Sequence, residues 1–160
     1  MSNKLYYTYD YIHNICRTKT TQIKSEFKPD IILAIGGGGL IPARIMRTDL
    51  KLPIYVVTFS TYDENDKPLD TPNVIQWMNF PKFKDKKILI VDEVDDTRKT
   101  LFFLVDKLIN KEQIKKENLG VFVIHNKNKA KFLSKKNLNV SYYLSGEDVD
   151  DKWIVYPWEQ

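Results

Sequence analysis

The sequence has few of the residues that build disulfide frameworks or zinc sites. Its 160 residues include one cysteine, Cys16, and two histidines. A single cysteine excludes an internal disulfide and is consistent with a reducing compartment, so we expect a cytoplasmic protein. One cysteine and two histidines are also too few for a typical zinc site. Cys16 falls among the apolar positions of a predicted helix, which indicates a core residue.

Long apolar runs are also missing. No segment approaches the roughly 20 apolar residues that a membrane-spanning helix needs, and the N-terminus lacks the apolar region of a signal peptide. The net charge is +4, and lysines gather at 82–87, 111–116 and 127–136. Because no exposed aromatics interleave with them, these clusters are more typical of a solvated surface than of a nucleic-acid interface. We expect neither membrane nor nucleic acid as a partner; a mild positive field suits a small polyanionic substrate.

Apolar and helical segments alternate along the chain, which predicts an α/β fold with a mostly parallel sheet flanked by helices. We expect helices at 10–27, after the glycines at 36–39 and from about residue 101, and strands at 31–35, 54–59, 87–91, 121–125 and 140–144. The length suits one domain, residues 1–160. Residues 61–86 break the alternation. Such a long polar connection is functional, disordered or a tolerated surface insertion.

The most informative segment runs from residue 88 to 100, Ile-Leu-Ile-Val-Asp-Glu-Val-Asp-Asp-Thr-Arg-Lys-Thr. An apolar run predicts a buried parallel strand, and four acids and two threonines follow on the loop that opens the next helix. Ligands bind at this end of strands in open α/β sheets, and a helix N-terminus offers N–H groups to phosphate. Carboxylates repel phosphate, so the loop predicts a ligand with two different ends. Asp92 and Glu93 can hold sugar hydroxyls or Mg²⁺, while residues 96–100 surround a phosphate. A ribose phosphate fits; an ordinary acidic helix cap would need only one aspartate.

This segment resembles the phosphoribosyl diphosphate (PRPP) motif of type I phosphoribosyltransferases. The resemblance implies the type I phosphoribosyltransferase fold, with a flexible hood loop at residues 61–86 and a small C-terminal base-binding segment. It also implies Mg²⁺ as cofactor and a homo-oligomer, either dimer or tetramer. Where the family usually has two glycines, this chain has Arg98 and Lys99, as in a fungal and microbial branch of purine enzymes. The PRPP-binding residues would be Asp92, Glu93, Asp95, Asp96, Thr97, Arg98, Lys99 and Thr100.

Four consecutive glycines, residues 36–39, follow the first predicted core strand and precede a helix. This arrangement suits close approach of the backbone to a diphosphate. The loop lacks both the P-loop ending and the third glycine of the dinucleotide fingerprint. In related xanthine-guanine enzymes a similar loop binds pyrophosphate, which implies this role for Gly36, Gly37 and Gly38. Gly37 stands where those enzymes have a basic residue; Arg44 is a candidate for the missing charge, or a plain surface arginine.

The C-terminal residues 152–159, Lys-Trp-Ile-Val-Tyr-Pro-Trp-Glu, look like the Trp-Ile-x-x-Pro-Trp-Asp segment of xanthine-guanine phosphoribosyltransferases. The resemblance implies that Trp153 stacks on the purine, that the backbone of Ile154 reads the base edge, and that Glu159 contacts the metal or its waters. Lys127, after the fourth predicted core strand, matches a lysine that donates to the purine 6-oxygen. Because ammonium donates and does not accept, this favours 6-oxopurines over adenine. The alternatives are that Trp153 and Trp158 only cover the sheet edge, that Lys127 is a solvated loop lysine, and that nearby Lys129 is the matching lysine.

Together these features indicate a purine phosphoribosyltransferase of purine salvage. It would convert hypoxanthine, guanine or xanthine and PRPP to the nucleoside monophosphate and pyrophosphate. Asp96 would be the catalytic residue that handles the N7 proton of the base, and Asp92, Glu93 and Glu159 would be metal ligands. Two alternatives stay open: a non-catalytic regulator that senses PRPP or nucleotides on the same fold, and a haloacid-dehalogenase-type phosphatase. The Asp-x-Asp-x-Thr spacing of the latter differs from that of this chain.

Overall fold

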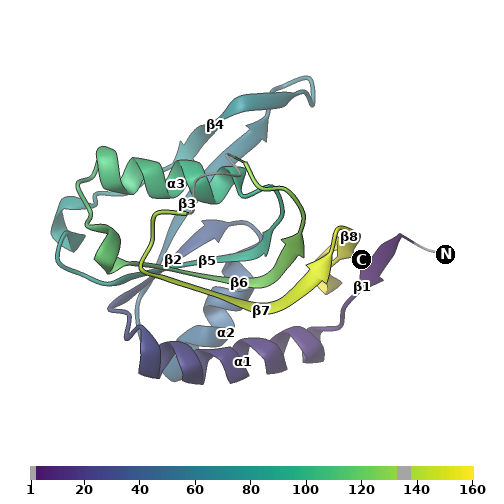
Figure 1. Ribbon diagram of the computed structural model, residues 1–160, viewed down its shortest axis with the longest axis horizontal. Helices are drawn as coiled ribbons and strands as arrows, with labels where there is room; N and C mark the ends of the chain where they lie inside the picture. The colour runs from purple at the N-terminus through teal and green to yellow at the C-terminus, as the bar shows by residue number, and fades with distance from the viewer. Residues whose placement is uncertain (1–2, 133–137) are drawn as a thin grey trace.

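The centre of the molecule is a six-stranded sheet built from the apolar runs of the sequence, seen in a computed structural model that describes residues 3–132 and 138–160 (Figure 1). The strand order is β4-β3-β2-β5-β6-β7. All neighbouring pairs are parallel except β3 and β4. The predicted mostly parallel α/β architecture is therefore confirmed. The strands are β2 (Ile31–Gly36), β3 (Ile54–Tyr62), β4 (Pro68–Gln76), β5 (Ile88–Asp95), β6 (Leu119–Asn128) and β7 (Tyr142–Asp150).

Helices cover both faces of this sheet. Figure 1 shows α1 (Tyr9–Glu26) and α2 (Leu40–Leu50) on one face and α3 (Lys99–Asn110) on the other. The Thr8 side chain caps α1 by accepting a hydrogen bond from the Tyr11 N–H. Two separate groups of buried apolar side chains fill the two interfaces, because each strand points alternate residues to opposite faces. Cys16 is fully buried on α1, as predicted.

Strand β5 is longer than the sequence indicates. The apolar run predicts an end at Val91, whereas the strand continues to Asp95. The reason is its neighbour β6, which also extends further and pairs Val94 with His125 and Asp95 with Asn126. The first three acids of the motif therefore lie on a strand and not on a loop, and the strand determines to which face of the sheet each side chain points.

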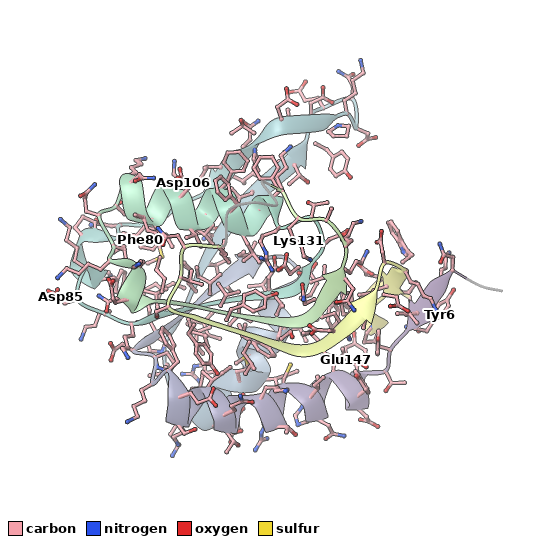
Figure 2. The ribbon with its side chains drawn as sticks, viewed as in Figure 1. Tyr6, Phe80, Asp85, Asp106, Lys131 and Glu147 are labelled. Atoms are coloured by element: carbon pink, nitrogen blue, oxygen red, sulfur yellow. The ribbon has the colours of Figure 1, made fainter. Side chains whose placement is uncertain are left out.

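Residues 61–86 form more structure than the polar composition suggests. The end of β3 and β4 make an antiparallel hairpin at the edge of the sheet, and a short 3₁₀ helix, η1 (Pro81–Phe83), follows. Pro68 and Pro72 are tolerated in β4 because it is an edge strand. Phe80 and Phe83 are buried, and Phe80 is labelled in Figure 2. Whether the hairpin closes over a ligand stays a prediction.

The two ends of the chain pair with each other. Strand β8 (Trp153–Val155) runs parallel to β1 (Lys4–Tyr6) in a separate two-stranded sheet, and a 3₁₀ helix, η3 (Pro157–Glu159), follows β8. Another 3₁₀ helix, η2 (Lys116–Asn118), precedes β6. Among the described residues, no helix combines the length and apolar character needed to cross a bilayer. The pairing with β1 places the C-terminal segment beside the ends of β6 and β7 (Figure 1).

Candidate active site

Two small cavities lie at the C-terminal edge of the sheet and share acidic residues. The first has a volume of about 190 Å³ and is lined by residues 92–101. The second has about 160 Å³ and is lined by Glu93, Val94, Asp96, Lys127, Trp153, Ile154, Tyr156 and Glu159. Glu93 and Asp96 belong to both linings. The fold thus brings the acid-rich motif, Lys127 and the C-terminal segment together. A larger cavity, of about 430 Å³ along α3, contains none of the predicted site residues.

Asp92 and Glu93 are adjacent acids in a dry environment. Asp92 is 9% exposed, and its Oδ1 accepts a hydrogen bond from the Glu93 N–H at 2.9 Å. Burial, and next the charge of Glu93, raises the pKa of Asp92 well above its usual value. Such a pair is stabilised by a cation or by hydroxyl donors, which is the chemistry that the motif predicts.

The glycine loop lies against Glu93. A Cβ atom at Gly38 would fall within 1.9–2.2 Å of the Glu93 carboxyl atoms, and one at Gly39 would be 2.3 Å from the Val91 carbonyl oxygen. Around Gly37 no atom lies within 4 Å of such a Cβ. The peptide bond between Gly36 and Gly37 is cis. Arg44 is exposed on α2 and donates to Thr48 at 3.1 Å. The loop and Glu93 therefore meet at van der Waals contact only because Gly38 lacks a side chain.

Residues 96–100 form the turn between β5 and α3. Lys131 Nζ donates to the carbonyl oxygens of Asp95 and Asp96, at 2.7 and 2.8 Å, and the Phe132 N–H donates to the Thr97 carbonyl at 2.6 Å. Figure 2 shows Lys131 beside this turn. Its side chain is only 15% exposed. The reading of residues 127–136 as solvated surface is therefore wrong for Lys131.

Two of the predicted PRPP-binding side chains of this turn, those of Arg98 and Lys99, donate hydrogen bonds to other parts of the protein. The Arg98 guanidinium donates to Asp95 Oδ2 at 2.7 and 2.9 Å. Lys99 Nζ donates to the Leu69 carbonyl in β4 at 2.5 Å. Thr97 is exposed. The roles assigned to these side chains stay predictions, and the Arg98 guanidinium is already paired with Asp95.

Lys127 and Asp96, which line the second cavity, belong to a group of four charged residues of alternating sign. Lys127 Nζ lies 3.3 Å from Asp96 Oδ2 and 3.9 Å from Asp151 Oδ1, while Lys129 Nζ lies 3.1 and 3.0 Å from the same two carboxylates. Lys127 is 8% exposed, so it is not a solvated loop lysine. Burial favours the protonated form of Asp96, but the hydrogen bonds and charges of Lys129 and Lys127 outweigh it and lower the pKa of Asp96. Asp96 is thus a carboxylate at neutral pH.

The C-terminal segment also lines the second cavity. Trp153 is 67% exposed and Ile154 is buried in the core. Trp158 stacks on the Tyr156 ring with centroids 4.7 Å apart. Tyr156 Oη donates to the Glu93 carbonyl at 3.0 Å, and the Tyr156 N–H donates to Glu159 Oε2 at 3.2 Å. Tyr156 therefore ties the C-terminal segment to the acid-rich strand.

Behind Tyr156 lies His125, which is fully buried. Its Nδ1 is 2.8 Å from Tyr156 Oη. Because the single phenol proton goes to the Glu93 carbonyl, Nδ1–H of His125 is the donor in this contact. Burial lowers the pKa of His125 to about 4, so the ring is neutral at pH 7. Sequence reasoning missed both His125 and Tyr156.

Comparisons with known proteins agree on one family. The model of the phosphoribosyl transferase domain matches residues 8–158. The hypoxanthine-guanine phosphoribosyltransferase of Schizosaccharomyces pombe is 43% identical, covering 98% of this chain and 89% of that protein. Xanthine phosphoribosyltransferase 1 of Saccharomyces cerevisiae is 38% identical, covering 99% and 90%.

Solved structures show the same fold. A Neisseria gonorrhoeae protein crystallised with bound ppGpp has a TM-score of 0.80 at 38% identity, covering 100% of this chain and 91% of that one. A purine phosphoribosyltransferase of Pyrococcus horikoshii has a TM-score of 0.77 at 26% identity, covering 99% and 95%. The similarity therefore extends over the sheet, the turn after β5 and the C-terminal segment.

Proposed function

This chain belongs to the phosphoribosyl transferase family, and we propose that the site formed by its two neighbouring cavities transfers the ribosyl phosphate of PRPP to a 6-oxopurine. The protein is a purine phosphoribosyltransferase of salvage, like the yeast enzymes that it matches over nearly its whole length. Its products would be pyrophosphate and the monophosphate of hypoxanthine, guanine or xanthine. The observation that carries the proposal is that Glu93 and Asp96 line both cavities, one beside the turn that suits phosphate and one beside Lys127 and Trp153.

The reaction would need charge placement more than a covalent nucleophile. As the bond from C1′ to the diphosphate oxygen breaks, positive charge develops on the ribose ring, and carboxylates nearby stabilise it. A purine ring nitrogen then bonds to C1′, and the N7 proton leaves to Asp96. The hydrogen bonds and charges of Lys129 and Lys127 lower the pKa of Asp96, which keeps it ionised, as a proton acceptor must be, and makes it a weak base while both lysines contact it. General acid–base help of this kind contributes about 10²–10⁴-fold.

Lys127 would select the base. Its buried ammonium reaches the second cavity and can donate to a 6-oxygen, whereas the 6-amino group of adenine offers no acceptor there. Donation to the base would draw Lys127 away from Asp96, 3.3 Å away, and leave Asp96 more basic. Trp153 supports stacking because its ring is largely exposed at the same cavity. The backbone of Ile154 would read the base edge.

Asp92, Glu93 and Glu159 would hold Mg²⁺, which neutralises the leaving diphosphate when bound. The raised pKa of Asp92 supports a cation beside it. Within residues 3–132 and 138–160, no three His, Cys, Asp or Glu side chains converge on one ion position. Magnesium ions often complete their shell with water and substrate phosphates, so PRPP would supply the remaining oxygens. Gly36, Gly37 and Gly38 would contact the pyrophosphate.

We also propose that residues 1–160 form one domain and that the protein is a cytoplasmic homo-oligomer, a dimer or tetramer. Sedimentation would give its size. The non-catalytic regulator has no support, because the yeast relatives carry the names of enzymes. The relative crystallised with ppGpp supports guanine nucleotides as ligands of this fold.

A direct assay tests the function. The protein is incubated with PRPP, Mg²⁺ and one base at a time, and the monophosphate is separated by chromatography. We expect turnover with one or more 6-oxopurines and none with adenine. In Lys127→Met, kcat/KM for the 6-oxopurine should fall about 100-fold, since a charge-assisted hydrogen bond is lost. Equal turnover of adenine, or none with any base, would reject the proposal.

A further inference from the structure

Arg98 has a backbone conformation that is unusual for a residue with a side chain. It lies between β5 and α3 with φ 68° and ψ 4°, the left-handed region, and it is the N-cap of α3 without a capping side-chain hydrogen bond. A Cβ atom approaches the following carbonyl in this region, so glycine is favoured there. Something in the surrounding structure must therefore hold Arg98 in place.

The restraint is a buried polar cluster, the Asp95 cluster, made of Asp95, Arg98, Lys131 and Tyr143. Both the Arg98 guanidinium and the Tyr143 hydroxyl donate to Asp95 Oδ2, at 2.7–2.9 and 2.7 Å. The guanidinium also lies over the Tyr143 ring, 5.2 Å from its centroid. The Asp95 side chain is fully buried, and that of Arg98 is 19% exposed. The charged end of Arg98 therefore points into the protein.

The same cluster orients the backbone of the turn. Lys131 Nζ donates hydrogen bonds to the carbonyl oxygens of Asp95 and Asp96 and lies 3.5 Å from Asp95 Oδ1. The N–H of the next residue, Phe132, donates a hydrogen bond to the carbonyl of Thr97. Three successive carbonyls are thus held on the side of residues 131–132.

The N–H groups of the turn face a different situation from its carbonyls. Among the described residues, none accepts a hydrogen bond from the backbone N–H groups of residues 97–100. Since the first N–H groups of a helix have no partner within it, they can bind an anion.

We propose that the Asp95 cluster is a positioning device that keeps the turn in its phosphate-binding shape, and that Arg98 acts through its backbone without contacting the phosphate. This inference rests on the proposed function. It gives Asp95 and Arg98 a different role from the direct PRPP contact that the motif predicts. It also explains how a chain with arginine at a glycine-like position keeps this turn.

Two substitutions of Arg98 separate the positioning role from direct contact. Alanine removes the anchor and keeps a Cβ atom in the left-handed region, whereas glycine removes the anchor and accepts that region freely. We expect the KM for PRPP to rise about tenfold in Arg98→Ala and to stay within about threefold of wild type in Arg98→Gly. The KM for the purine should not change in either. Arg47→Ala, at an exposed arginine of α2, is the matched control and should change nothing.

Direct contact predicts a different pattern. If Arg98 bonded the phosphate, Arg98→Gly and Arg98→Ala would lose PRPP affinity equally, and this result would overturn the proposal. Tyr143→Phe keeps the ring and removes only its bond to Asp95, so it covers the case in which Arg98→Ala fails to fold. It should raise the KM for PRPP several-fold without changing the KM for the purine.

Failure of the cluster and failure of the proposed function give different results. If the wild type transfers no ribosyl phosphate, the proposed function is rejected. Thermal unfolding and calorimetric binding of ribose 5-phosphate then still test the cluster. Arg98→Gly should melt at a higher temperature than Arg98→Ala and bind ribose 5-phosphate more tightly; the reverse order in either measurement would overturn the positioning role.

Discussion

Three consecutive glycines of the loop between β2 and α2 should respond differently to the same substitution. Replacing each by alanine adds one methyl group, and none of the three has a positive φ. The added Cβ would meet nothing at Gly37, the end of the Glu93 side chain at Gly38, and backbone carbonyls at Gly39. The outcome therefore depends on whether the obstacle is absent, mobile or fixed.

The distances give the size of each effect. At Gly39, contacts of 2.3 Å to the Val91 oxygen and 2.7 Å to the Ile35 oxygen involve two strands, so alanine should destabilise the fold by about 2–3 kcal/mol and lower Tm by roughly 5–10 °C. At Gly38 the obstacle is the Glu93 carboxyl at 1.9 Å, which must move by about 1.5–2 Å to reach van der Waals distance. A side-chain end can do so with little loss of stability. Gly37→Ala should change stability by less than about 0.5 kcal/mol.

Activity should follow a different order from stability. If Glu93 holds the metal or the ribose from its present position, Gly38→Ala displaces it, and a shift of about 1 Å can reduce turnover about 100-fold. Thermal unfolding and steady-state kcat/KM for PRPP are measured on all three variants and on Glu93→Ala. Since Gly38→Ala and Glu93→Ala remove the same interaction, their effects should not add in the double variant. Normal turnover by Gly38→Ala would show that the position of Glu93 does not matter and would refute the reasoning.

Three further predictions address the base, the proton and the buried histidine. Asp96→Asn should lower kcat about 100-fold or more, with little change in stability because the Asp96 side chain is 45% exposed. Asp151 contacts the same two lysines, so Asp151→Asn is the control. An equal loss of kcat in both variants would contradict the role assigned to Asp96. Trp153→Leu should raise the KM for the purine roughly tenfold and leave the KM for PRPP unchanged, because stacking is lost at an exposed ring. The pKa of His125 is about 4 in the folded protein and 6.5 in the unfolded chain, so the unfolded chain takes up a proton first as the pH falls. The free energy of unfolding should therefore be unaffected by His125 above pH 6.5 and decrease by about 3 kcal/mol as the pH falls to 4. Chemical denaturation at pH 7 and 4.5 measures this decrease in the free energy of unfolding. The wild type and the control His13→Gln, at an exposed histidine, should show the decrease in full, and His125→Gln should show a smaller one. Equal decreases in all three proteins would exclude His125 as the cause.

Most of the architecture could be predicted because it depends on local patterns. Apolar runs of four to six residues alternating with helical periodicity predict a parallel sheet, and the strand that precedes Asp92 was correctly identified. Its C-terminal end was not, because Asp92, Glu93 and Asp95 are poor strand formers, and pairing with β6 keeps this stretch in the sheet. The hairpin within residues 61–86 was missed for a similar reason. Its prolines argue against a strand in the sequence. They are compatible with β4 only because β4 lies at the edge of the sheet.

The site residues that sequence reasoning missed act through contacts between distant segments. Tyr156 bonds Glu93, 63 positions away, and His125 bonds Tyr156 from the next strand. No motif in the sequence marks either residue. Their contacts arise only in the fold, from the parallel register of β5 and β6 and from the pairing of β8 with β1. The short resemblance in the C-terminal segment could predict Trp153 at the site, and the cavity it lines together with Lys127 could be recognised only from the fold.

One missed feature did have a signal in the sequence. Lys127, Lys129 and Lys131 occupy every second position after the apolar part of β6, and an extended chain directs alternate side chains to one side. In the fold all three reach the acid-rich turn: Lys127 and Lys129 contact Asp96, and Lys131 holds the carbonyls of Asp95 and Asp96. Gly37 stands where related enzymes have a basic residue, and the Arg98 guanidinium, although Arg98 lines the first cavity, is paired with Asp95. These three lysines therefore place positive charge beside the acid-rich turn, and their side chains are only 9%, 27% and 15% exposed.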